Sequence, residues 1–265
     1  MTTFTSRFAG FLSATVLAVG MAAIAQPAAA GIVGSMHDFS SAAPASGGNA
    51  VAQICVYCHT PHGADTIPGA PIWNRFVDET IDYGFYGSAS ATMDGDASAG
   101  PGSVSRACLS CHDGTQALDA LRNMPGTGST PNPTPIDNLV NGTIRDLIEG
   151  DTNTPGVGLD NDHPIGMNYC AAPTGSTILD STTCVDTSFS DASTNGTRFF
   201  IEAVNNAPDA IFQKHDLPLF GSAGDNARVE CATCHDPHQG DSTISTTFLR
   251  VKSDASEICL TCHTK

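Results

Sequence analysis

Eight of the ten cysteines lie in four C-x-x-C pairs, and a histidine follows each pair directly. The repeats read CVYCH at 55–59, CLSCH at 108–112, CATCH at 231–235 and CLTCH at 259–263. At this spacing two thiols can add to the two vinyl groups on one porphyrin edge, and the next residue can bind iron through its imidazole. The pattern predicts four covalently attached haem c groups.

The residues predicted to hold haem follow from the motifs. The attachment cysteines are Cys55, Cys58, Cys108, Cys111, Cys231, Cys234, Cys259 and Cys262. The proximal iron ligands are His59, His112, His235 and His263. Two other interpretations of C-x-x-C pairs compete, namely two zinc sites of four cysteines each and a disulfide scaffold. Zinc leaves the four histidines without a role, and C-x-x-C loops are strained as structural disulfides.

Five further histidines are available for the opposite faces of the irons. Four of them are expected to be distal ligands: His37, His62, His163 and His238. His215 is expected to have no ligand role, and Met124 and Met167 are alternatives that sufficient histidines make unnecessary. Two imidazoles on every iron leave no position open for a substrate, and axial ligation and access largely set what a haem does. The count therefore favours electron transfer over catalysis.

Two of the motifs carry a second histidine three residues after the first, in CVYCHTPH and CATCHDPH. Three residues span at most about 11 Å when fully extended, which is less than opposite axial ligands of one iron require between their backbones. His62 and His59 therefore cannot bind the same iron, and neither can His238 and His235. Each doubled motif is predicted to hold two different haems together.

Cys170 and Cys184 belong to no haem motif. They are predicted to form a disulfide, because the chain begins with features of an exported protein and disulfides persist outside the cytoplasm. Residues 1–30 contain one charge, an apolar run and the small-residue ending Ala28-Ala29-Ala30, as in a secretory signal peptide. We expect a secreted mature chain of residues 31–265 that does not insert into a membrane. The net charge of −16 excludes a nucleic-acid partner.

The composition predicts a mostly irregular fold with a few short helices and minimal strand. Aromatic residues make up only 6%, so we expect haem to supply much of the core of one domain. Its parts are an N-terminal arm (31–54), a first haem-pair region (55–122), a middle segment (123–225) and a second haem-pair region (226–265). Helices are expected around 113–122, 143–149 and 199–213.

Several stretches resemble the doubled-CXXCH multihaem cytochromes: SMHDFS at 35–40, CVYCHTPHG at 55–63, APIWNRF at 70–76, NDHPIGM at 161–167, LPLFG at 217–221 and VECATCHDPH at 229–238. With four haem motifs, the chain looks most like the OmcE-type tetrahaem cytochromes, which polymerise into extracellular filaments. The resemblance implies distal roles for His62, His163 and His238. It also implies that one distal histidine, here His37, is donated to a neighbouring subunit. Trp73 is expected at a haem edge or in ordinary packing.

These expectations combine into a non-enzymatic electron-transfer protein. The leading hypothesis is a filament subunit that conducts electrons through stacked bis-histidine haems to redox partner cytochromes or extracellular acceptors. A monomeric periplasmic electron shuttle is the alternative, and a multihaem reductase with one open iron is the third.

Overall fold

The computed structural model describes residues 31–39, 53–66, 70–86, 93–95, 97, 100–113, 121–123, 158–160, 162–173, 175–203, 211–221, 227–239 and 247–264. The predicted signal peptide lies outside these residues. Among the described residues, no helix is long and apolar enough to cross a membrane.

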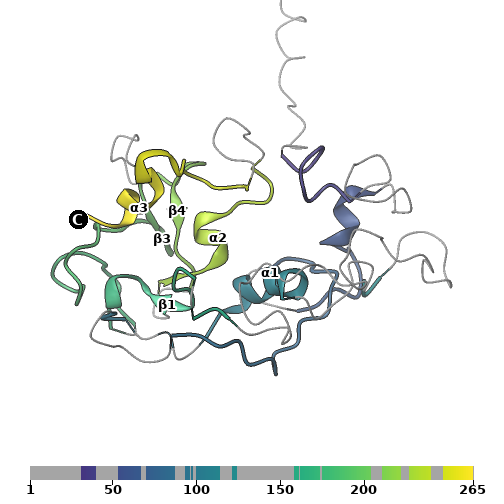
Figure 1. Ribbon diagram of the computed structural model, residues 1–265, viewed down its shortest axis with the longest axis horizontal. Helices are drawn as coiled ribbons and strands as arrows, with labels where there is room; N and C mark the ends of the chain where they lie inside the picture. The colour runs from purple at the N-terminus through teal and green to yellow at the C-terminus, as the bar shows by residue number, and fades with distance from the viewer. Residues whose placement is uncertain are drawn as a thin grey trace, which may run out of the picture.

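Short elements joined by irregular chain make up the described part of the fold (Figure 1). The helices are η2 (Ile54–Tyr57), α1 (Ser103–His112), η3 (Tyr169–Ala171), α2 (Cys231–Cys234), η4 (Asp254–Ser256) and α3 (Glu257–Cys262). The strands are β1 (Met167–Asn168), β2 (Ser193–Asn195), β3 (Arg198–Ile201), β4 (Leu217–Pro218) and β5 (Arg228–Val229). This confirms the expected loop-rich fold class.

The strands form two small antiparallel sheets. β1 pairs with β5, with Met167 opposite Val229. The second sheet has the order β2-β3-β4, with Phe200 opposite both Ser193 and Pro218. The first pairing ties the middle segment to the residues directly before α2, so it connects parts of the chain that lie 62 positions apart.

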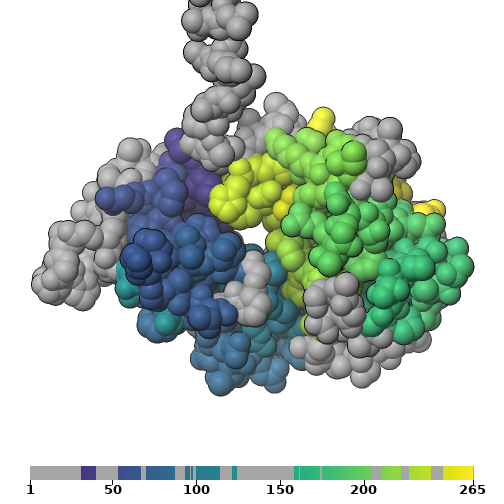
Figure 2. Space-filling model, turned by 180° about the vertical axis from the view of Figure 1, so that it is seen from behind, coloured from purple at the N-terminus to yellow at the C-terminus, as the bar shows by residue number. Residues whose placement is uncertain are grey.

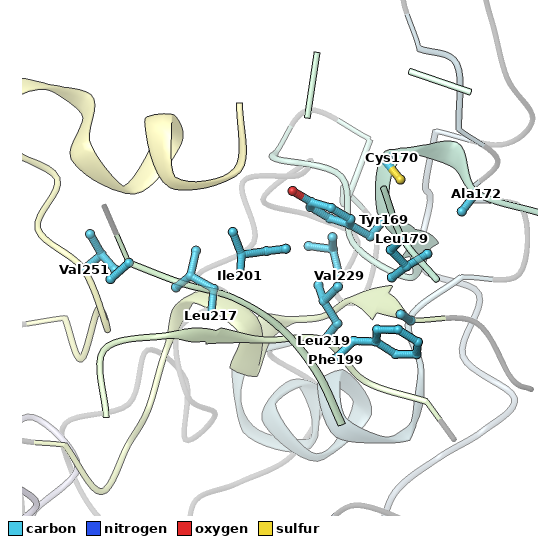
Figure 3. Close-up of a cluster of buried hydrophobic side chains, with 12 residues drawn as sticks. Tyr169, Cys170, Ala172, Leu179, Phe199, Ile201, Leu217, Leu219, Val229 and Val251 are labelled. Carbon is cyan, nitrogen blue, oxygen red and sulfur yellow. The ribbon is translucent and has the colours of Figure 1, made fainter. Parts of the chain in front are cut away.

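A side-chain core fills the part of the molecule around β3 and β4 (Figure 3). It consists of Tyr169, Cys170, Ala172, Leu179, Phe199, Ile201, Ala203, Leu217, Leu219, Ala227, Val229 and Val251. A smaller cluster joins Tyr83, Leu109 and Leu159. This core of side chains is larger than the composition predicted. Most of its residues come from a few short apolar stretches of the middle segment, which pack together although the chain as a whole has few aromatic residues.

Cys170 and Cys184 form a disulfide at the edge of this core, with their Cα atoms 5.2 Å apart. Cys170 is fully buried, and Cys184 packs against the cluster. The bond holds the loop between η3 and β2 against the core.

The helix expected at 199–213 is wrong at its start, because Phe199–Ile201 belong to β3. A short apolar run has no periodicity that separates a buried strand from a buried helix, and pairing with β2 and β4 decides it here. Asp113 caps α1 rather than beginning a helix, and Leu121 bridges to Arg75. Residues 114–120, 143–149 and 204–210 lie outside the described residues.

Candidate haem-binding site

Each of the four C-x-x-C-H motifs lies on a short helix. Three of the cysteine pairs lie within α1, α2 and α3, and the first pair spans η2, with Cys58 at its end. Residues three apart share one face of a helix, so each pair of thiols points to one side. All eight motif cysteines are free of disulfides, which leaves their thiols available to a porphyrin.

The chain leaves the helix at the histidine in two of the motifs and turns extended. His235 and His263 cap α2 and α3 with φ/ψ near −109/139° and −101/132°. They bridge to Leu249 and Phe189 respectively, and His59 bridges to Trp73 in the same way. His112 differs because it is the last residue of α1. Extended backbone and a bridge fix the direction of each imidazole away from its helix.

Backbone carbonyls orient several of the imidazoles. His59 Nδ1 lies 3.0 Å from the Pro71 carbonyl oxygen, and His235 Nδ1 lies 2.8 Å from that of Thr247. When Nδ1–H donates to a carbonyl, Nε2 keeps its lone pair and faces the other way. This is the tautomer and the kind of outer contact that a metal-binding imidazole requires.

In three pairs of histidines from distant segments, the two rings lie close to each other. The ring centroids are 5.8 Å apart for His112 and His37, 5.9 Å for His59 and His238, and 6.4 Å for His263 and His163. Metal–imidazole bonds are about 2 Å long, so imidazoles on opposite faces of one iron have centroids roughly 6 Å apart. The angle between the planes is free, because each ring can rotate about its bond to the metal. The spacing fits bis-histidine ligation of three irons.

His37 lies against its own chain. Its ring stacks on Phe248 at 4.8 Å and lies beside His112. Burial, followed by the nearby His112 and His235, lowers the pKa of His37 to about 4. The imidazole is therefore neutral at neutral pH, as an iron ligand must be. The arm at 31–39 folds back onto the same chain, and the role of His37 as donor to a neighbouring subunit stays a prediction.

The fourth proximal histidine, His235, has no histidine ring opposite it among the residues that the structure describes. It lies close enough to His37 and His112 to lower the pKa of both imidazoles. His62 is exposed, and in the described structure its ring meets no other histidine. Its backbone carbonyl accepts hydrogen bonds from Thr60 and Asn123.

The other candidate ligands have different surroundings. His215 Nδ1 lies 3.0 Å from the Arg250 carbonyl oxygen and 3.3 Å from Gln239 Nε2. Met167 is buried in β1 opposite Val229. Met124 lies outside the described residues. That His215 and Met167 do not bind iron stays a prediction.

Burial favours the protonated form of three of the attachment thiols. Burial raises the pKa of Cys58 to about 12, that of Cys234 to about 11 and that of Cys262 to about 12. In the described residues no group of three or more histidines, cysteines or carboxylates is arranged to hold a metal ion directly. The four-cysteine clusters that a zinc interpretation needs are therefore not formed by these residues, whereas separate thiol pairs with facing imidazoles fit haem c.

Two residues of the site had no assigned role from the sequence. Arg75 is fully buried, donates from Nε to the Ser110 carbonyl at 3.3 Å, and its charge faces Cys58 and Cys111. Glu230, directly before Cys231, is 2% exposed. The signal for Glu230 was a charged residue directly before a haem motif, whereas Arg75 lies 16 residues after the first motif and had no such signal. Trp73 is placed edge-on to His59 at 5.9 Å, with Nε1 donating to Ser110 Oγ.

Figure 2 shows how the segments around this site meet. The purple segment 31–39 lies against the yellow-green part of the chain, which includes the stacking of His37 on Phe248. Beside this contact the surface is hollowed between the blue first half and the green second half. The pair of His59 and His238 connects these two halves, and so does the contact of His37 with Phe248.

Short helices that carry cysteine pairs, adjoining histidines and facing imidazoles define the class of multihaem c-type cytochromes. The paired motifs indicate covalently bound haem c and electron transfer rather than catalysis, although some multihaem cytochromes are reductases. Residues 225–265, which contain the motifs on α2 and α3, match the doubled CXXCH motif family. No curated protein matches the chain.

Proposed function

We propose that the chain is a tetrahaem cytochrome that conducts electrons as the polymerising subunit of an extracellular filament. The observation that carries the proposal is the set of three facing histidine pairs, at 5.8, 5.9 and 6.4 Å. Each pair combines one histidine of a C-x-x-C-H motif with one from a distant segment. Such an arrangement serves haems that are closed on both faces.

The haem iron supplies reversible one-electron chemistry when bound. The chain's own residues hold the group and limit what it can do. The thiol pairs would attach the porphyrin, and the paired imidazoles would hold its iron and leave no position for a substrate. The carbonyl contacts at His59 and His235 hold each Nε2 in one direction. A rigid ligand set also keeps the rearrangement that accompanies each electron transfer small.

The doubled motifs connect haems to one another. His238 follows His235 by three residues, yet it faces His59 of the first motif. The motif on α2 therefore provides a proximal ligand for its own haem and a distal ligand for the first haem. This supports the inference from chain length that a doubled motif holds two haems together.

A second copy of the chain completes the ligand set in this proposal. Among the described residues no histidine ring lies opposite His235, and His62 is exposed with no other histidine ring beside it. Because His37 lies beside His112 in its own chain, we propose His62 as the donor to a neighbouring subunit, with the predicted donor His37 as the alternative. Joining His62 of one copy to His235 of the next generates an open, repeating assembly. Electrons then pass along it to redox partner cytochromes or extracellular acceptors.

The test combines haem counting, optical spectra and microscopy on the exported protein. The pyridine haemochrome assay should give four haems per chain, and the assembled protein should be low-spin at every iron. Negative-stain images should show filaments, which the variant His62→Ala should lose while His215→Ala retains them. Two haems per chain would refute the tetrahaem assignment.

The other functions give different results in the same experiment. Dispersed single particles with four low-spin haems would indicate a periplasmic shuttle. A high-spin haem that persists in the assembled protein would indicate a reductase with an open iron at His235. Loss of filaments in His37→Ala, with filaments retained in His62→Ala, would show that His37 is the histidine donated to the neighbouring subunit.

A further inference from the structure

Glu230 joins the two halves of the chain through buried hydrogen bonds. Its carboxylate accepts bonds from the Gly102 backbone N–H, at 3.1 Å to each oxygen, and from the Ser105 hydroxyl. Ser105 Oγ in turn accepts a bond from the Cys231 backbone N–H at 2.9 Å. Glu230 and Ser105 are 2% and 0% exposed. These bonds connect residues 125 to 128 positions apart, so they fix α1 relative to α2.

The local backbone is shaped to admit this carboxylate. A Cβ atom at Gly102 would lie 2.4 Å from Glu230 Oε1, although the φ of −73° at Gly102 suits any residue. Glycine is thus required here for space. A second close approach lies beside it, where a Cβ at Gly166 would lie 2.2 Å from the Gly100 carbonyl oxygen. Gly166 also donates its N–H to Val229. Three chain segments therefore meet at one tightly packed junction.

The same junction brings two haem motifs together. The thiols of Cys108 on α1 and Cys231 on α2 lie near enough to affect each other's pKa, which is raised for Cys108 and lowered for Cys231. The imidazoles that end these motifs, His112 and His235, are close enough to interact electrostatically. Each thiol is the first cysteine of its own motif. Cys108 and Cys231 would therefore attach the second and third haems at neighbouring positions.

A buried carboxylate is a costly way to pack two helices. Removing its charge from water disfavours folding unless hydrogen bonds compensate. Apolar side chains would join α1 and α2 without that cost, but they would allow the helices to slide. The carboxylate of Glu230, which precedes α2, accepts hydrogen bonds from Gly102 and Ser105 at α1. Ser105 also accepts a bond from Cys231 on α2. Together these bonds set the distance and the orientation between the two helices.

We propose that Glu230 and Ser105 are positioning residues that set the contact between the haem on α1 and the haem on α2. This contact is the crossing point between the first pair of haem motifs and the second pair. The inference rests on the proposed electron-transfer function. In this proposal the rate of electron transfer between these two haems, and their electronic coupling, depend on the hydrogen bonds between α1 and α2.

The experiment uses the full-length haem-loaded protein and the variants Glu230→Ala, Glu230→Gln and Ser105→Ala. The control Ser193→Ala removes a hydroxyl that donates to Glu202 at 2.5 Å beside the sheet of β2 and β3, away from the junction. Haem content and low-spin spectra are measured first, because a wild-type chain without covalent haem would refute the proposed function itself. Soret circular dichroism then reports excitonic coupling between neighbouring haems, and spectroelectrochemistry reports the separation of their reduction steps.

We expect Glu230→Ala and Ser105→Ala to keep four low-spin haems and to lose amplitude in the Soret couplet. Glu230→Gln, which keeps one carbonyl oxygen for the Gly102 N–H, should restore part of it. Ser193→Ala, which also loses one hydroxyl, should leave the couplet unchanged. An unchanged couplet in fully loaded Ser105→Ala and Glu230→Gln, or an equal loss in Ser193→Ala, would overturn the proposal. If Glu230→Ala does not accumulate, the other two variants decide by the same criterion.

Discussion

Removing the Cys170–Cys184 disulfide should loosen the part of the molecule that holds His263 opposite His163. The bond joins residues 14 positions apart, and for a loop of about 15 residues chain entropy gives roughly 3 kcal/mol of stabilisation. For a chain of this size each kcal/mol shifts the melting temperature by about 2–4 °C. The double variant Cys170→Ala/Cys184→Ala should therefore melt about 6–12 °C lower by these relations.

The effect should reach the last haem motif through the side-chain core. Tyr169, next to Cys170, donates its hydroxyl to the carbonyls of Ser190 and Cys262 at 2.8 and 3.3 Å. The Phe189 ring lies 4.4 Å from His263. Loss of the cross-link should thus weaken the surroundings of His263 first, and a high-spin Soret band should appear on heating before the main unfolding transition.

The assay follows thermal unfolding of the haem-loaded protein in the far-ultraviolet and in the Soret band. Ser176→Ala is the matched control, because Ser176 lies inside the same loop and bonds only to the nearby Pro173 carbonyl. A melting temperature of the double variant equal to that of the control would refute the reasoning. So would a high-spin band that appears only with complete unfolding.

Three further changes test the site itself. His238→Ala should make the haem attached beside His59 high-spin in visible and paramagnetic resonance spectra, whereas His215→Ala should leave every haem low-spin. Gly102→Ala should lower the unfolding free energy in denaturant titrations by about 1–3 kcal/mol, as overpacking does, because the new methyl would collide with Glu230. Burial raises the pKa of Glu230 above its ordinary value of 4.5. The folded state then binds this proton more tightly, so the contribution of Glu230 is complete below pH 4.5 and is lost as the pH rises through the folded pKa; Glu230→Gln should flatten that part of the stability curve.

Each of these expectations has a contrary result. Low-spin spectra at all irons in His238→Ala would show that His238 does not bind the iron of the first haem. Gly102→Ala with wild-type stability would show that the carboxylate can move aside. A pH profile of Glu230→Gln identical to that of the wild type would assign the dependence to other groups.

The local chemistry of the chain could be predicted because it depends on short spacing alone. Two thiols at i and i+3 on a helix share a face, so the motifs predict where the cysteines point without knowledge of the fold. His238 cannot bind the iron of His235, because three residues do not reach from one side of an iron to the other. The position of His238 beside His59 is consistent with this.

Secondary structure between the motifs was harder to predict. The run Phe199–Ile201 was expected to be helical, yet it is buried on both sides within β3. Its partners, Ser193 and Leu217 among them, lie on other segments. A short apolar run adopts the conformation that its neighbours pair with, and that information is not local.

The sequence by itself determined the cofactor, its attachment points and the surplus of histidines, since these are properties of residue types at fixed separations. Only the tertiary structure decided which imidazoles face each other. His37 lies beside His112, and Glu230 bonds to Gly102, because distant segments pack into one structure. A pairing between residues more than 70 or 120 positions apart has no signature in local spacing. It is set by the free energy of packing the whole chain.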